Sequence, residues 1–76
     1  MTKYIEVNAK MTTEGKVIPL SIIWEDGKTF SIDKVTDVRP LASTKGGGVG
    51  VRYICKIKGK EKTLFLSDYR WFIEYD

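Results

Sequence analysis

The sequence predicts an all-β protein in which short antiparallel strands form one small barrel. Three features support this prediction: apolar and polar residues alternate along most of the chain, polar turns that contain glycine separate the alternating runs, and no run has helical periodicity. A chain of 76 residues has room for a single hydrophobic core. We therefore expect one domain that covers residues 1–76.

The first two strands are predicted from alternation on either side of a polar turn. Apolar residues take every second position in Lys3–Met11, which is typical of a strand with one buried face. The polar segment 12–16 contains a glycine for a tight reversal, and a second strand follows at Val17–Glu25. Because proline cannot donate a hydrogen bond to a neighbouring strand, we expect this strand to lie at an edge of the sheet near Pro19. In the second strand, one face holds Ile18, Leu20, Ile22 and Trp24, and the other holds Val17 and Ile23.

The third strand begins after the strongest hairpin signal in the chain. Asp26-Gly27 predicts a type I′ turn, because glycine readily adopts a positive φ. The strand runs from Lys28 toward Pro40, but its apolar alternation shifts by one position between Asp33 and Lys34. We expect a β-bulge or a sharp bend at that point.

Two further strands follow a glycine-rich loop. The segment Leu41–Gly48 has loop composition and ends in three consecutive glycines. A strand at Val49–Lys58, a turn at Gly59-Lys60 and a strand at Glu61–Leu66 are expected to form a hairpin. The residues of the first of these strands that we assign to the core are Val49, Val51, Tyr53, Cys55 and Ile57.

The C-terminal segment is predicted to hold one helical turn and a last strand. The turn covers Ser67–Arg70, with Ser67 or Asp68 as its cap, and the strand covers Trp71–Tyr75. Five or six strands with one bulge are typical of a small antiparallel barrel of the SH3-like type. An OB-like barrel, which usually contains a longer helix and more residues, and an open β-roll are the alternatives.

The residue types present exclude several kinds of site. The chain has no histidine and one cysteine, so the usual zinc sites, His-based triads and an intrachain disulfide are excluded. We interpret Cys55 as a small buried apolar residue. We therefore expect no metal, no cofactor and no enzymatic activity. The lack of a disulfide and of a long apolar run predicts a cytoplasmic protein that does not contact a membrane.

The positive charge is concentrated in one predicted hairpin. Residues 45–62 contain six basic residues and one acid, a net charge of +5, whereas the rest of the chain carries −2. A basic hairpin with aromatic residues nearby is typical of a surface that binds nucleic acid. It is also typical of a solvated hairpin whose lysines keep a sheet edge from pairing with other chains.

We therefore expect a small non-enzymatic binding module that engages a protein or a nucleic acid through the basic hairpin and nearby aromatics. The residues expected to contact the partner are Arg39, Lys45, Arg52, Lys56, Lys58, Tyr69, Arg70 and Trp71. The alternative is a self-associating accessory subunit, a homodimer that pairs through the aromatic strand 71–75 or the edge at Pro19.

A set of short motifs resembles a family of small all-β bacterial proteins, found mainly in Gram-positive species, to which no activity is assigned. The resemblance covers nearly the whole chain and implies a compact all-β domain, but it identifies no catalytic or binding residue. The motifs that carry it are Ile18-Pro19-Leu20, Trp24-Glu25-Asp26-Gly27, Ile32-Asp33-Lys34-Val35, Asp37-Val38-Arg39-Pro40, Gly48-Val49-Gly50-Val51-Arg52-Tyr53, Gly59-Lys60-Glu61 and Trp71-Phe72-Ile73-Glu74.

Overall fold

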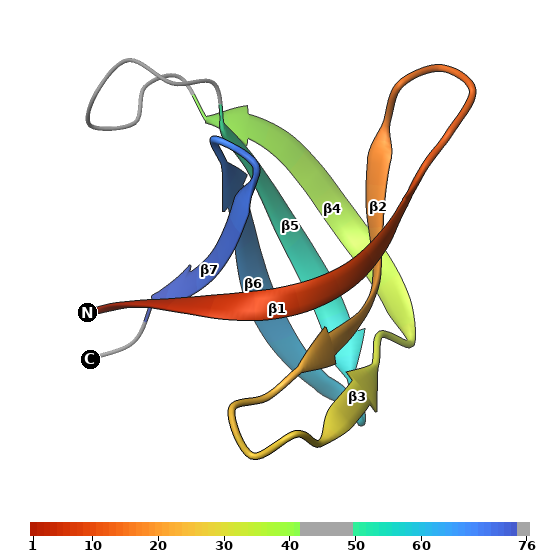
Figure 1. The fold of residues 1–76 in the computed structure, drawn as a ribbon. Helices are drawn as coiled ribbons and strands as arrows, with labels where there is room; N and C mark the ends of the chain where they lie inside the picture. The colour runs from red at the N-terminus through yellow and green to blue at the C-terminus, as the bar shows by residue number, and fades with distance from the viewer. Residues whose placement is uncertain (42–49, 75–76) are drawn as a thin grey trace.

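The protein is an all-β molecule, as the alternation predicts (Figure 1). The computed structural model describes residues 1–41 and 50–74. These residues form one antiparallel sheet of seven strands in the order β3-β2-β1-β7-β6-β5-β4. The strands are β1 (Thr2–Met11), β2 (Val17–Ile23), β3 (Thr29–Ser31), β4 (Lys34–Leu41), β5 (Gly50–Ile57), β6 (Lys60–Ser67) and β7 (Arg70–Glu74).

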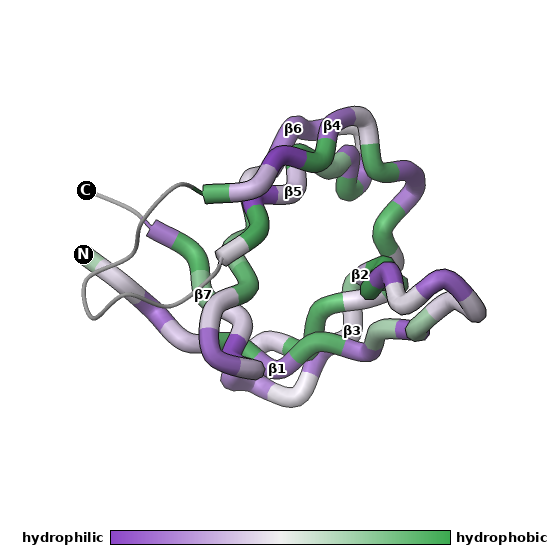
Figure 2. The backbone as a smooth tube through the Cα atoms, turned by 90° about the horizontal axis from the view of Figure 1, so that it is seen from above, coloured by the Kyte–Doolittle hydropathy of each residue, from purple (hydrophilic) through white to green (hydrophobic). Residues whose placement is uncertain are grey.

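The sheet curls strongly into an open half-barrel. Figure 2 shows β4, β5 and β6 on one side of the curl and β1, β2 and β3 on the other. Strands β3 and β4 are the two edges, and within the described residues no strand ladder joins them. The expected five or six strands become seven, because the predicted third strand is divided into β3 and β4 at residues 32–33. That division lies where the apolar alternation shifts.

A bulge follows this division in the edge strand β4. Val35 pairs with Cys55 and Asp37 pairs with Ile54, so Thr36 is an extra residue in β4. Its hydroxyl donates a hydrogen bond of 3.1 Å to the carbonyl of Ile54. The bulge changes which residues of β4 face outward, and it brings Asp37 to the same face as the arginine two positions later.

The turn between β1 and β2 and the turn between β2 and β3 each have a glycine in the third loop position. In the turn between β2 and β3, the amide of Gly27 donates to the carbonyl of Trp24 at 2.9 Å, and Gly27 has a φ of 86°. Asp26 is not among the residues of positive φ, so the turn is a three-residue loop that ends in a glycine bulge. The hairpin prediction is confirmed, but its assignment to type I′ is wrong.

The two remaining hairpins have two-residue turns in which both residues have positive φ. Lys58 and Gly59 have φ values of 51° and 75°, one position before the predicted turn. Asp68 and Tyr69 have φ values of 52° and 63°, and Ser67 pairs directly with Arg70. The predicted helical turn is therefore wrong, because this pairing leaves only two residues to reverse the chain.

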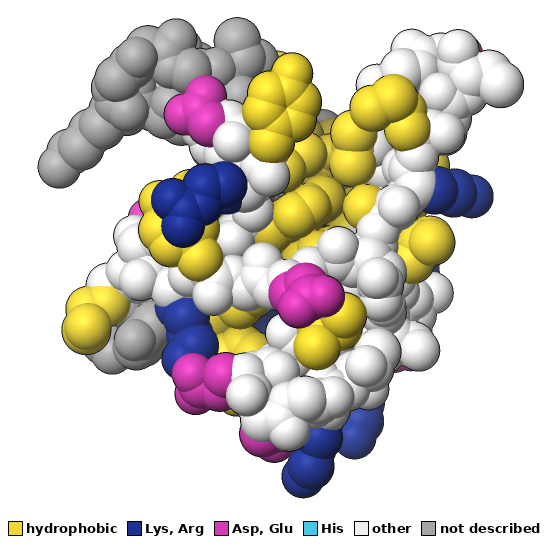
Figure 3. Space-filling model, viewed as in Figure 1, with side chains coloured by type: hydrophobic (Ala, Val, Ile, Leu, Met, Phe, Trp, Pro, Cys, Tyr) yellow, Lys and Arg dark blue, Asp and Glu magenta, His cyan; other side chains and the backbone are white. Residues whose placement is uncertain are grey.

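The core is thin and centres on β5 and β6. Its central cluster of buried residues consists of Tyr53, Cys55 and Leu64, so the assignment of Cys55 to the core is confirmed. The hydroxyl of Tyr53 donates a hydrogen bond of 2.6 Å to the carbonyl of Val17 at the start of β2. This bond joins the two sides of the curl. Figure 3 shows apolar side chains in the opening between β7 and β2.

The division of β2 into two faces differs from the prediction. Ala9 pairs with Pro19 and Asn8 pairs with Ser21, so a bulge leaves Leu20 without a partner in β1. As a result Pro19 is fully buried, whereas Leu20 is 45% exposed. The β3 ladder covers only residues 21–23 of β2, so β2 has no β3 partner at Pro19.

The far end of strand β1 is also more exposed than the alternation predicts. Ala9 and Met11, which we assigned to the buried face, are exposed. The hairpin of β1 and β2 extends beyond the rest of the sheet (Figure 1). Its outer end therefore has no opposing layer to cover it.

Candidate nucleic-acid interface

The outward face of β4 and β5 carries four cationic side chains. Tyr53, Cys55 and Ile57 of β5 are buried, so the alternate residues of β5 face outward. Cross-strand pairs share a face, and Arg52 pairs with Arg39 while Lys56 pairs with Lys34. We call this surface the basic track, and it consists of Lys34, Arg39, Arg52 and Lys56.

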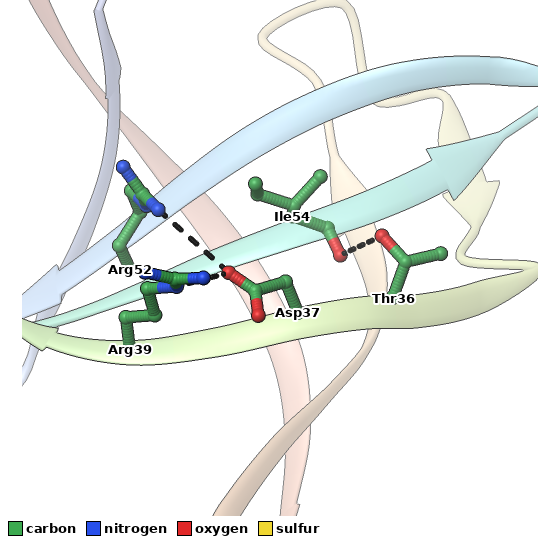
Figure 4. A network of polar contacts seen from close by, with 5 residues as sticks. All are labelled: Thr36, Asp37, Arg39, Arg52 and Ile54. Atoms are coloured by element: carbon green, nitrogen blue, oxygen red, sulfur yellow. Dashed lines mark hydrogen bonds and ion pairs between the residues drawn. The ribbon is translucent and has the colours of Figure 1, made fainter.

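One carboxylate holds both arginines of the basic track (Figure 4). The Nε atom of Arg39 lies 3.0 Å from Oδ2 of Asp37, and Nη2 of Arg52 lies 3.7 Å from the same oxygen. Each guanidinium has five donors, so a single carboxylate cannot satisfy the two groups. Within the described residues, the Nε atom of Arg52 is buried without an acceptor. Apart from this buried atom, the two guanidinium groups keep donors available for a further anion.

The two lysines of the basic track are not neutralised. Within residues 1–41 and 50–74, neither Lys34 nor Lys56 has a carboxylate within ion-pair distance. Glu61 pairs with Lys56 in the β6 ladder but does not form an ion pair with it. With Asp37 and Glu61 counted, the charged side chains of this face sum to +2. Lys34 and Arg39 are exposed, whereas Arg52 and Lys56 are half-buried.

The basic track is long enough to contact more than one phosphate of a nucleic-acid strand. Arg52 and Lys56 are four residues apart in one strand, a distance of about 13 Å at about 3.3 Å per residue. Each of the four cations can contact one phosphate, so the track offers at most four phosphate contacts. Its side chains are the two types that contact phosphate most often.

A row of aromatic rings continues the outward face beyond Arg52. Arg52 pairs with Phe65, Phe65 with Phe72, and Phe72 with Tyr4, across β5, β6, β7 and β1. The rings of Phe65 and Phe72 stack at 5.1 Å, and Tyr4 contacts Phe72 edge-on at 5.8 Å. The guanidinium of Arg70 lies 3.5 Å from the centre of the Tyr4 ring. We call Tyr4, Phe65 and Phe72 the aromatic row.

The structure brings together only part of the set predicted from sequence. Arg39, Arg52 and Lys56 share the basic track. Arg70 lies on the aromatic row, and Tyr69 is fully exposed at the tip of the turn before it. Lys45 lies outside the described residues.

Two of the predicted contact residues face the inside of the curl. Trp71 is half-buried and packs against the core, with its ring 5.2 Å from that of Tyr53, so it lies neither on the basic track nor on the aromatic row. Trp71 and Phe72 are consecutive in β7, so their side chains lie on opposite faces of the sheet. The pairing of β7 with β1 and β6 places Phe72 on the outward face. Lys58 reaches the ring of Phe30 at 5.0 Å, at the mouth of the curl.

The lysines of the predicted basic hairpin therefore divide between two faces. Lys60 and Lys62 pair with the inward residues Ile57 and Cys55. Together with Lys58 they border a groove of about 590 Å³ at the mouth of the curl, whose walls include Trp24 and Phe30. The sequence alone does not separate these lysines from Lys56, because the division depends on the position of the turn at Lys58-Gly59.

The two buried titratable groups stay in their neutral forms near pH 7. Burial raises the pKa of the Cys55 thiol above its usual 9.0. Burial, and then the neighbouring Cys55, raise the pKa of the Tyr53 hydroxyl above 10.0. Within the described residues, no group of three or more Asp, Glu or Cys side chains is placed to hold a metal ion. The chemistry that this surface offers is the binding of anions.

The described residues also contain no helix with the length and apolar character needed to cross a membrane. Comparison with protein-family models, with curated proteins and with solved structures gave no match for this chain. The resemblance to the small bacterial family stays a prediction.

Proposed function

We propose that this protein is a non-enzymatic module that binds nucleic acid through the basic track. The observation that carries the proposal is the arrangement of Lys34, Arg39, Arg52 and Lys56 on one sheet face, where Asp37 is the only carboxylate of residues 1–41 and 50–74 within ion-pair distance. Within the described residues, the two lysines have no ion-pair partner. Phosphate contacts of this kind supply most of the affinity of sequence-independent binding.

Asp37 acts in this proposal as a positioning residue. Its contacts with both arginines restrain two long side chains that would otherwise sample many rotamers. Planar guanidinium groups bind phosphate oxygens in a two-point manner, so a restrained pair favours contact with successive phosphates. The lysines at the other end of the track act as point charges.

A charge-matched pair of double variants tests the proposal. Lys34→Gln with Lys56→Gln removes two charges from the track, whereas Lys10→Gln with Lys16→Gln removes two exposed charges from the β1–β2 hairpin. Binding of a labelled 12-nucleotide strand is measured by fluorescence anisotropy between 50 and 200 mM salt. The track variant should make the negative slope of log K against log salt shallower by about 1.4, since each phosphate contact contributes about −0.7 for a single strand. Equal changes of this slope in both double variants would show that the nucleic acid does not bind at the basic track.

The contacts within the sheet do not favour self-association through the C-terminal strand. Strand β7 lies between β1 and β6, so both of its backbone edges are paired within the chain. The edge strand β4 has a bulge at Thr36 and a proline at position 40, both of which oppose the addition of another strand.

We also propose that the curled sheet is of the SH3-like type, because SH3-like domains are small barrels of antiparallel strands.

A further inference from the structure

A hollow lies over the aromatic row, next to the arginine end of the basic track. Its volume is about 620 Å³, which is within the usual range for small-ligand sites. Tyr4, Phe65 and Phe72 line it, and Phe65 is the cross-strand neighbour of Arg52. Neighbouring strands are about 4.8 Å apart, so the row extends about 14 Å from Arg52 to Tyr4. A nucleic-acid strand whose phosphates contact Arg52 has its bases within reach of these rings.

The polar groups of the hollow suit the edges of bases better than phosphates. Asp68 and Glu74 contribute carboxylates, which repel phosphate but accept hydrogen bonds from base amino groups. Arg70 contributes a guanidinium that lies over the ring of Tyr4. Bases stack both on aromatic rings and on arginine planes. The charge pattern therefore favours contact of the phosphate backbone of the nucleic acid with the basic track and contact of its bases with the hollow.

We infer that the hollow takes unpaired bases, and that the protein selects single-stranded over double-stranded nucleic acid. The inference rests on the proposed function, because the hollow adds contacts to a strand that the basic track already holds. The bases of a duplex are stacked on each other and paired, so they cannot enter a hollow on a sheet face without being extruded. Only a single strand gains the contacts with Tyr4, Phe65 and Phe72.

Substitution of an exposed ring tests the inference without disturbing the core. Tyr4 is 53% exposed and lines the hollow, whereas Tyr69 is fully exposed but does not line it. Tyr4→Ala and Tyr69→Ala are compared with the unsubstituted protein, using a labelled 12-nucleotide strand and the duplex of the same sequence. Loss of one stacked base costs about 1–3 kcal/mol, which is about a 5- to 150-fold change in Kd.

The expected result is that Tyr4→Ala weakens single-strand binding at least 5-fold, leaves duplex binding unchanged and keeps the salt slope, while Tyr69→Ala changes nothing. Equal Kd values for strand and duplex, together with no effect of Tyr4→Ala, would overturn the inference but leave the track proposal standing. An equal loss of strand and duplex binding in Tyr4→Ala would also overturn it. Failure of both nucleic acids to bind at 50 mM salt would remove the inference and the proposed function together.

Discussion

The hydrogen bond between Tyr53 and Val17 should contribute measurably to the stability of the open half-barrel. It is 2.6 Å long and joins β5 to the start of β2 across the inside of the curl. Tyr53→Phe keeps the buried ring and removes only the hydroxyl. The lost hydrogen bond costs about 1 kcal/mol, and the part-buried carbonyl of Val17 that loses its partner raises the total to about 2 kcal/mol. For a domain of this size that corresponds to a decrease in Tm of about 8–16 °C.

The assay is chemical and thermal unfolding followed by tryptophan fluorescence. Trp71 is a suitable probe because its ring lies 5.2 Å from that of Tyr53. Tyr69→Phe is the matched control, since the Tyr69 side chain is fully exposed, and it should leave the free energy of unfolding unchanged. If Tyr53→Phe lowered the free energy of unfolding by less than about 0.3 kcal/mol, the bond would not hold the two sides of the curl together.

Three other predictions follow from the buried groups and the turns. Folding raises the pKa of Cys55 and the pKa of Tyr53. Their contribution to stability is therefore complete below their unfolded pKa values of 9.0 and 10.0, and it is lost as the pH rises through their folded pKa values. Urea midpoints that stay constant from pH 8 to pH 11 would contradict this prediction. Cys55→Ser should destabilise by about 1–3 kcal/mol more than Cys55→Ala, because it buries a hydroxyl, and equal urea midpoints would argue against a dry core. Tyr69→Gly should raise the free energy of unfolding by about 1 kcal/mol, because Tyr69 has a φ of 63°; a lower Tm would show that the turn is not strained.

Local patterns predicted most of the strands and the hairpins. The alternation in Lys3–Met11 and the glycine at position 27 are local signals, and each has a direct counterpart in β1 and in the turn after β2. The turn at Asp68-Tyr69 could not be found in this way. Neither residue is glycine, and both adopt a positive φ only because β6 and β7 pair directly on either side of them.

The candidate site depended on information that is not local. Arg52 and Lys56 share a strand, so their common face follows from alternation alone. The position of Asp37 beside Arg39 depends on the bulge at Thr36, which shifts the face of β4 by one residue. The exact position of a bulge cannot be derived from the apolar pattern, because the residue that leaves the ladder is polar.

The aromatic row was missed for a related reason. Tyr4, Phe65 and Phe72 lie in three separate strands, and each appears in the sequence as an isolated outward residue. They become neighbours only because β7 pairs with both β1 and β6. A long-range pairing between the first and the last strand has no turn sequence that could reveal it. The same pairing places Trp71 on the inner face of β7.

The most direct test of the account is the affinity of the protein for a labelled single strand as a function of salt. Four phosphate contacts at the basic track predict a slope of log K against log salt of about −2.8, or about a 50-fold loss of affinity between 50 and 200 mM salt. The Lys34→Gln, Lys56→Gln variant should halve that slope. Binding that does not change with salt, or no binding at 50 mM salt, would contradict the claim that the outward face of β4 and β5 holds nucleic-acid phosphates.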